Sequence, residues 1–414
     1  MTLGHRHVQL GLIATVQVLG MAMWFSASAV VPALREAWHI GDLQAVWLTA
    51  SVQVGFVIGA AASTLLNLPD RVPPQYVTAG SALAAAASTA AVPALADGFA
   101  TAVALRLLTG AFLAGIYPVG MKLMASWFGA SGRGQALGVL VGALTLGSAL
   151  PHLINGFGRL PWHAVLFAAA ALGVVAAAVA GLLVRQGPHI GVTGARLHPR
   201  YAIEMFRERG PRLANLGYFG HMWELYALWT WLPAFLLASR ADSGAVGPPQ
   251  ASLGLIAFVV IGGAGAVGCL VGGVGADRYG RAPVAAAALV VSGACCLVSP
   301  LIYGAPMVVL LPVLLVWGAA VIADSGVFST ALSEVADHRY VGTALTAQTA
   351  IGFLLTVVSM NVVPLLAAQL GWRYAFLLLA PGPVLGALAM RSLGRRLRSE
   401  ASDGRSADPV ARGS

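Results

Sequence analysis

Three ionisable side chains lie within long apolar stretches of this chain: Arg106, Glu224 and Asp324. A charged group costs free energy in an apolar medium, so each of them is a functional candidate by default. Arginine keeps its proton and can hold an anion, whereas a carboxyl group can take up and release a proton. His152 and His221 add two groups that titrate near neutral pH. These residue types indicate anion binding and proton exchange.

The apolar run 213–238 carries two of these groups close together. His221 and Glu224 are three residues apart, so on a helix they share a face with Trp231, and Tyr218 flanks that face. This spacing predicts a carboxyl group that exchanges a proton inside an aromatic-walled site. The alternative is that Glu224 pairs with His221 or Arg106 for packing alone.

Arg106 and Asp324 each have two open interpretations. Arg106 either binds an anionic substrate and influences Glu224, or it forms a structural salt bridge or contacts backbone carbonyls. Asp324 is followed by Ser325, so a role at a helix end or in a latch competes with lining the transport path.

Two further positions are weaker candidates. His152 continues a polar stripe with Thr145 and Ser148, which either lines a path or forms hydrogen bonds between helices. Trp24 shares a face with Gln17 in the first apolar run. We interpret the three cysteines as core residues, since their spacing fits neither a metal site nor a disulfide framework.

The elements that position these side chains are set by an unusually apolar composition. Of 414 residues, 58% are hydrophobic and 9% are charged, whereas soluble proteins carry about 25% charged residues. So few charges cannot cover a water-soluble fold, and lipid must surround most of the surface. The composition predicts an all-α membrane protein.

Twelve apolar runs are long enough to cross a bilayer, given about 20 residues per crossing. They lie near residues 8–33, 43–66, 76–96, 98–121, 135–157, 162–184, 213–238, 250–274, 284–303, 307–330, 343–369 and 374–391. We expect a six-helix bundle over 1–184, a basic cytoplasmic linker over 185–212, a second six-helix bundle over 213–391 and a disordered cytoplasmic tail over 392–414.

The distribution of basic residues predicts the orientation. If the N-terminus is cytoplasmic, 18 arginines fall in cytoplasmic segments and 4 fall in outer loops. Basic residues stay on the cytoplasmic side, so both termini are expected there, with an even number of crossings.

The two halves look like copies of one unit. Asp70 and Asp277 are 207 residues apart, and Trp162 and Trp372 are 210 apart. Landmarks that recur at nearly one offset indicate a duplicated six-helix unit.

A charged cluster, GVGADRYGR, lies between two apolar runs at residues 273–281. A tight turn needs glycine, which Gly280 supplies. A carboxylate such as Asp277, near a helix N-terminus and beside Arg278 and Arg281, can hold two bundles together and release them. With Gly273 these residues predict a conformational latch; the alternative is a positive anchor on the cytoplasmic side.

This segment resembles the loop signature of the major facilitator superfamily, G-x-x-x-D-R-x-G-R-R, with Ala282 at the last basic position. The matching first-half loop keeps only Asp70 and Arg71, which we expect to belong to the same conformational latch. Arg106, four residues before Gly110, is similar to the family's fourth-helix motif. The resemblance implies twelve helices in two bundles, with the first, fourth, seventh and tenth lining a central cavity.

One motif is better explained by packing. Gly263, Gly265 and Gly268 fit G-x-G-x-x-G, but no strand precedes them, so a dinucleotide site is not expected. With Gly272 they predict a close-packing helix face.

The resemblance implies a secondary active transporter, a symporter or antiporter that works by alternating access. Arg106, Tyr218 and Trp24 favour a small anion or polar metabolite, with protons as a coupling ion. The branch that fits best resembles nitrate or cyanate permeases, although this chain lacks their arginines in the second and eighth helices. A proton-coupled multidrug efflux antiporter is the alternative, and a non-transporting sensor or scaffold is an alternative of another class.

We do not expect an enzyme, because neither H-E-x-x-H nor G-x-S-x-G occurs. No cofactor, metal or nucleic acid is expected. The expected partners are a small-molecule substrate, protons and the lipid bilayer, for a monomer in the inner membrane of a bacterium.

Overall fold

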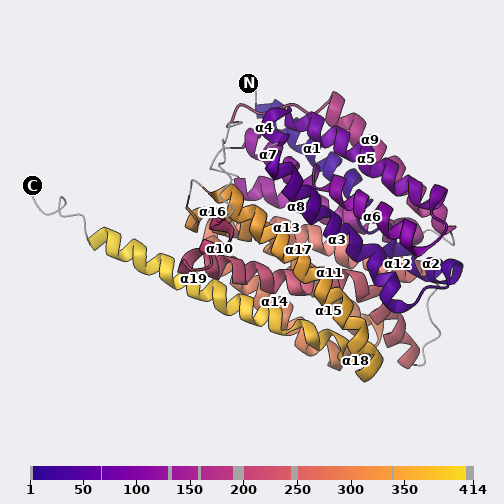
Figure 1. Cartoon of the computed structure of the whole chain (residues 1–414). Helices are drawn as coiled ribbons and strands as arrows, with labels where there is room; N and C mark the ends of the chain where they lie inside the picture. Colours follow the sequence, from indigo (N-terminus) through magenta and orange to yellow (C-terminus); the bar gives the residue numbers. More distant parts are fainter. Residues whose placement is uncertain are drawn as a thin grey trace, which may run out of the picture.

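A computed structural model describes residues 3–66, 68–128, 133–156, 160–189, 200–243, 250–337 and 340–406 (Figure 1). The regular structure of these residues is entirely helical. Within them, ten helical segments are long and apolar enough to cross a membrane. They comprise α3 (Asp42–Leu65), α5 (Pro74–Leu95), α6 (Phe99–Leu113) with α7 (Tyr117–Trp127), α8 (Arg133–Gly156), α9 (Trp162–Leu182), α12 (Gln250–Ala257) with the π-helix η2 (Phe258–Ala264) and α13 (Gly265–Tyr279), α14 (Arg281–Ile302), α15 (Met307–Ala323) with α16 (Ser325–Val335), α17 (Val341–Leu370), and α18 (Trp372–Ala375) with η3 (Phe376–Leu379) and α19 (Pro381–Ser406).

Two of the predicted spans are helical but less apolar than these ten. They correspond to α1 (Leu3–Met21) and α11 (Arg209–Asp242). α1 packs against α8 and α9, and α11 packs against α17 and α19, so both lie within the helix assembly. The short helices α4 (Leu68–Arg71) and α10 (Tyr201–Glu204) belong to connections.

The first apolar run, 8–33, is not the single helix that its composition predicts. α1 ends at Met21, turns follow over 22–27, and the chain resumes as η1 (Ser28–Val30) and α2 (Val31–Trp38). Pro32 lies in the first turn of α2, where its missing N–H costs nothing, whereas in a helix interior it would remove a hydrogen bond. The break leaves backbone carbonyls near Trp24 that need other donors.

Several other predicted spans are helical, but each is divided into two helices or extends beyond its predicted end. The run 98–121 divides into α6 and α7, with Pro118 in the first turn of α7. The run 307–330 divides into α15 and α16 at Asp324 and continues to Val335. The run 250–274 passes through η2 and continues to Tyr279. The narrow gaps predicted at 96–98 and 304–306 are confirmed, because α5 ends at Leu95 and α14 at Ile302.

Helices before and after residues 190–199 lie mainly on opposite sides of the molecule (Figure 1). We call them the first and second halves. Contacts between the halves are made by α3 against α17 and by α8 against α12 and α13. The predicted small-residue face of 263–272 lies partly here and partly inside the second half. A Cβ at Gly268 or Gly272 would come within 2.0 or 1.8 Å of the carbonyl oxygens of Ala319 and Ala323, so close packing is confirmed at these two glycines.

The C-terminal tail differs from the sequence expectation. A disordered segment was predicted from residue 392, but α19 continues without a break to Ser406. Apart from Gly394, residues 392–398 are serine, leucine and arginine, which are acceptable helix formers. Each residue added to an existing helix gains one hydrogen bond without a new nucleation step. Residues 407–414 lie outside the described residues.

Candidate functional site

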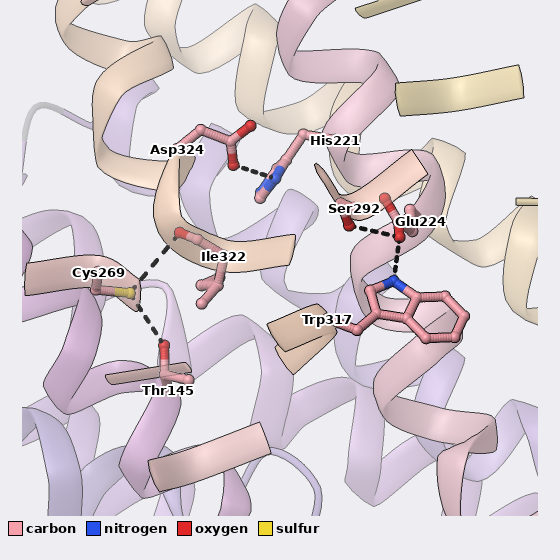
Figure 2. A network of polar contacts seen from close by, with 8 residues as sticks. All are labelled: Thr145, His221, Glu224, Cys269, Ser292, Trp317, Ile322 and Asp324. Carbon is pink, nitrogen blue, oxygen red and sulfur yellow. Dashed lines mark hydrogen bonds and ion pairs between the residues drawn. The ribbon is translucent and has the colours of Figure 1, made fainter. Parts of the chain in front are cut away.

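Glu224 is held inside the second half by three hydrogen-bond donors. Its Oε1 accepts from Ser292 Oγ at 2.7 Å, from Cys296 Sγ at 3.1 Å and from Trp317 Nε1 at 2.6 Å. The donors come from α14 and α15, and only 1% of the Glu224 surface is exposed. Figure 2 shows the carboxyl group of Glu224 between Ser292 and the indole of Trp317. The sequence pattern around Glu224 did not predict these donors.

His221, one turn earlier on α11, pairs with Asp324. Its Nδ1 lies 2.9 Å from Asp324 Oδ1, and both side chains are buried (Figure 2). Asp324 stands at the break between α15 and α16, where its backbone carbonyl accepts from the N–H groups of Val327 and Phe328. Asp324 therefore stands at a helix junction, and its carboxyl group also faces a titratable partner. Its lining of a transport path stays a prediction.

The predicted face of α11 is present, but its partners differ from those expected. Glu224 takes its hydrogen bonds from α14 and α15, whereas His221 pairs with Asp324. Tyr218 and Phe328 flank the His221 ring at centroid distances of 6.1 and 5.4 Å. The aromatic neighbour of Glu224 in this conformation is thus Trp317, whereas Tyr218 lies beside His221. An aromatic-walled proton site at Glu224 stays a prediction.

Arg106 is fully buried and donates hydrogen bonds to groups of the interrupted first span and to α3. Nη1 donates to Met23 O at 2.9 Å and to Ser26 Oγ at 3.1 Å, Nη2 donates to Trp24 O, and Nε donates to Leu48 O at 3.2 Å. The guanidinium thus satisfies carbonyls that the break after Met21 leaves without helical partners. Of the two interpretations of Arg106, contact with backbone carbonyls is the one present in this conformation.

A cluster of six aromatic rings joins the two halves near Trp24. We call it the interface cluster; its members are Trp24, Phe25, Phe56, Tyr226, Trp229 and Phe353. Trp24 lies 5.0 Å from Phe56 in its own half, and 5.9 and 5.5 Å from Tyr226 and Phe353 in the other half. These rings come from the turns after α1, from α3, α11 and α17, so four segments distant in sequence form one aromatic contact.

Three buried polar atoms in or beside the interface cluster have no hydrogen-bond partner among the described residues. They are Trp24 Nε1, Trp229 Nε1 and Gln53 Oε1. Gln53 is fully buried and precedes Phe56 by three residues on α3, and its Nε2 reaches only Met360 Sδ at 3.9 Å. Buried polar groups normally have partners, so these two donors and one acceptor are candidates for hydrogen bonds to a further molecule. A glutamine in a strongly apolar run was the available sequence signal for Gln53.

The predicted latch residues form a turn that binds the N-terminus of α8. Asp277 Oδ2 accepts the backbone N–H of Gln135 at 3.1 Å, where the positive end of the helix dipole favours a carboxylate. Gly280 ends α13 with φ of 91°, a conformation that glycine adopts readily. Gly273 permits close approach, because a Cβ there would lie 2.8 Å from Gly134 O.

The arginines of this turn stay on the second half. Arg281 Nε lies 3.0 Å from Glu334 Oε1, and Arg278 lies over the ring of Tyr279 at 5.3 Å. In the corresponding first-half connection, Arg71 is exposed at the end of α4, and the side chain of Asp70 lies outside the described residues.

The remaining candidates are buried but lie apart from the carboxyl groups. His152 is 5% exposed, towards the end of α8. Thr145, on the same helix, lies 3.7 Å from Cys269 Sγ across the two halves, and Cys269 also reaches Ile322 O (Figure 2). All three cysteines are buried and free. No group of three or more His, Cys, Asp or Glu side chains suited to a metal ion occurs among the described residues.

Comparison with known proteins gives a single family. A family model described as Major Facilitator Superfamily matches residues 13–360, which is most of the chain. No curated protein matches the sequence.

Proposed function

Because the chain belongs to the major facilitator superfamily and is a multi-pass membrane transporter, we propose that it moves a small organic solute by alternating access, coupled to protons. The observation that carries this proposal is that the buried titratable groups and the buried aromatic contact lie in different places. The titratable His221, Glu224 and Asp324 lie inside the second half, whereas the contact between the halves around Trp24 is aromatic and uncharged.

We propose twelve crossings in two six-helix bundles, with both termini cytoplasmic. The ten apolar segments are completed by α1 and α11, each of which packs against helices of the ten. His221 and Glu224 of α11 bond to partners inside the protein. A helix with these polar residues can therefore still cross the membrane. The excess of arginine on one side supports the orientation.

The proton site in this proposal is the pair of His221 and Asp324 together with Glu224. A buried ion pair is stable only while both partners remain and balance each other. Protonation of Asp324 would weaken its attraction to His221 at the junction of α15 and α16. A change of protonation is thereby linked to the geometry of that junction, as alternating access requires.

The solute site in this proposal is the interface cluster. Trp24 Nε1, Trp229 Nε1 and Gln53 Oε1 offer two donors and one acceptor, and the rings offer flat apolar faces. When the halves move apart, these groups would face the space between them. An uncharged or amphipathic molecule with an apolar ring and hydrogen-bonding groups suits this composition.

Two other substrate classes, amphipathic cations and small inorganic anions, differ in how well they suit the interface cluster. Aromatic rings attract lipophilic cations through their faces, so efflux of amphipathic cations is the second candidate. A small inorganic anion has less support, because the Arg106 guanidinium that favoured it donates to Met23, Trp24, Ser26 and Leu48.

The latch in this proposal is the bond of Asp277 to the start of α8. It joins the second half to the first at the end where α13 meets α14. Opening of that side requires this bond to break, and a single charged hydrogen bond at a helix end is a modest barrier.

A thermal-shift screen of the purified protein tests the solute site. The library contains uncharged aromatic metabolites, amino acids, sugars, small anions and lipophilic cations. A ligand of the folded state adds about 2.7 kcal/mol to the free energy of unfolding at a hundredfold excess over Kd. We expect an uncharged or amphipathic hit whose shift is lost in Gln53→Leu. Gln17→Leu is the matched control, because Gln17 is a buried glutamine that lines a hollow within the first half.

Uptake of that hit into proteoliposomes under a pH gradient tests the proton site. In Glu224→Gln the amide oxygen still accepts the three hydrogen bonds, so the variant is expected to fold while the response to the gradient is lost. Glu334→Gln, at the exposed Arg281 pair, is expected to transport like the wild type. An unchanged gradient response in both Glu224→Gln and Asp324→Asn would remove proton coupling from the proposal.

A further inference from the structure

The exposed face of α19 changes from leucine to arginine along its length. Leu385 and Leu388 are 65% and 54% exposed, and no other described element covers them. Arg391, Arg395 and Arg398 follow at spacings of three and four residues and are exposed. This spacing keeps all five residues on one side of the helix.

α11 shows the same change at its beginning. Leu216 is 47% exposed, and Arg212 and Arg209 precede it by four and seven residues on the same side of the helix. Both arginines are exposed. On each helix, an apolar face that suits acyl chains therefore ends in arginine.

The two faces end side by side. α11 and α19 pack against each other, and a Cβ at Gly217 would come within 2.5 Å of Met390 Sδ. Nearer the start of α11, a Cβ at Gly210 would lie 3.4 Å from an Nη atom of Arg396. Figure 1 shows the last turns of α19 projecting beyond α10 and α16 at this end of the molecule.

The local charge is strongly positive. Residues 200–212 and 391–400 contain eight arginines and three glutamates. One arginine of the eight is engaged by a glutamate, since Arg396 Nε lies 2.7 Å from Glu400 Oε1. Ile203, on the neighbouring α10, is 72% exposed, which places a further apolar side chain beside these charges.

We propose that Arg209, Arg212, Arg391, Arg395 and Arg398, here called the arginine band, bind the phosphate headgroups of anionic phospholipids. The apolar faces of α11 and α19 place acyl chains directly above the band. Guanidinium groups pair with phosphate through two parallel hydrogen bonds. The band is independent of the proposed solute and proton sites, although α11 also carries His221 and Glu224 and would be anchored at its base by such lipids.

Native mass spectrometry of the purified full chain, titrated with phosphatidylglycerol or phosphatidylcholine, tests this proposal. We expect preferential retention of phosphatidylglycerol. The double variant Arg395→Gln/Arg398→Gln should weaken it roughly fivefold for each arginine removed, given the known electrostatic attraction per basic residue. The matched control is Arg240→Gln/Arg373→Gln, which removes one arginine from the end of α11 and one from α18, the short helix that precedes α19.

A charge-preserving variant and a competition measurement complete the experiment. Arg395→Lys/Arg398→Lys keeps the charge and is expected to retain most of the preference, which separates charge from folding. Glycerol phosphate without acyl chains is expected not to displace the lipid. Equal phosphatidylglycerol affinity in both glutamine variants would overturn a headgroup site on the band. Displacement by glycerol phosphate would overturn the assignment of the ligand as a phospholipid, because a free phosphate ester would then be sufficient.

Discussion

At the scale of single residues, the buried charges divide into a structural one and a titratable set. Arg106 has three hydrogen bonds to backbone and hydroxyl groups at the break after α1 and a fourth to Leu48 O of α3. The carboxyl groups of Glu224 and Asp324 can instead take up a proton; Glu224 accepts hydrogen bonds from Ser292, Cys296 and Trp317, and Asp324 pairs with His221. The same residue class, an ionisable group in an apolar helix, therefore serves two purposes in one chain.

Arg106→Lys tests the structural role. Lysine keeps the charge but lacks the planar fork that reaches several carbonyls at once. Hydrogen bonds to charged groups contribute about 1.5–3 kcal/mol each, so we expect the free energy of unfolding to fall by about 3 kcal/mol, seen as a lower Tm in detergent. Arg398→Lys, on the exposed face of α19, should leave Tm unchanged. A variant of normal stability that has lost solute binding would place Arg106 in the solute site.

At the scale of helices, close packing is set by glycines whose missing Cβ admits a neighbouring backbone. Gly268 and Gly272 on α13 meet Ala319 and Ala323 on α15, whereas a Cβ at Gly263 would meet no atom within 4 Å. Two glycines of the predicted close-packing face thus pack tightly, whereas Gly263 has no neighbour that a Cβ would meet. The difference follows from which helix face each glycine occupies.

Gly268→Ala is expected to destabilise the protein. The added Cβ would come within 2.0 Å of a carbonyl oxygen, which cannot rotate away as a flexible side chain can. The two helices must separate, at a cost of about 1–3 kcal/mol, measurable as a lower Tm. Gly263→Ala is the control in the same span and should cause no loss. Equal Tm values for the two variants would contradict the observed contact of α13 with α15.

At the scale of the whole molecule, the two halves touch through α8 and α13 and through the interface cluster. A Cβ at Gly142 on α8 would lie 3.6 Å from the Cβ of Cys269 on α13. Disulfides have Cβ separations of 3.5–4.5 Å, so one substitution supplies a test of relative motion between the halves.

Gly142→Cys is expected to form a disulfide with Cys269 under oxidising conditions. Thiol labelling should then fall by two groups per molecule, and solute flux should stop until a reductant is added. Gly142→Cys in a Cys269→Ser background should transport under both conditions. Full flux in the oxidised, cross-linked protein would show that transport does not require α8 and α13 to separate.

The sequence alone predicted the class of molecule and most of its elements. Run length and apolarity are local properties, so the apolar spans, the narrow gaps at 96–98 and 304–306 and the turn at Gly280 were accessible from residue order. Motif residues around Asp277 indicated the superfamily. The break in the first span was missed because composition does not show that Arg106, far along the chain, replaces the lost helical hydrogen bonds.

Only the tertiary structure decided how the candidate residues are paired. His221 and Glu224 share a helix face, as their spacing predicts, but the choice of Asp324 for one and of Ser292 and Trp317 for the other depends on how α14 and α15 pack against α11. The interface cluster collects rings from four distant segments. Helical periodicity determines which side a residue faces, whereas the partner on that side is determined by helix packing across tens to hundreds of residues.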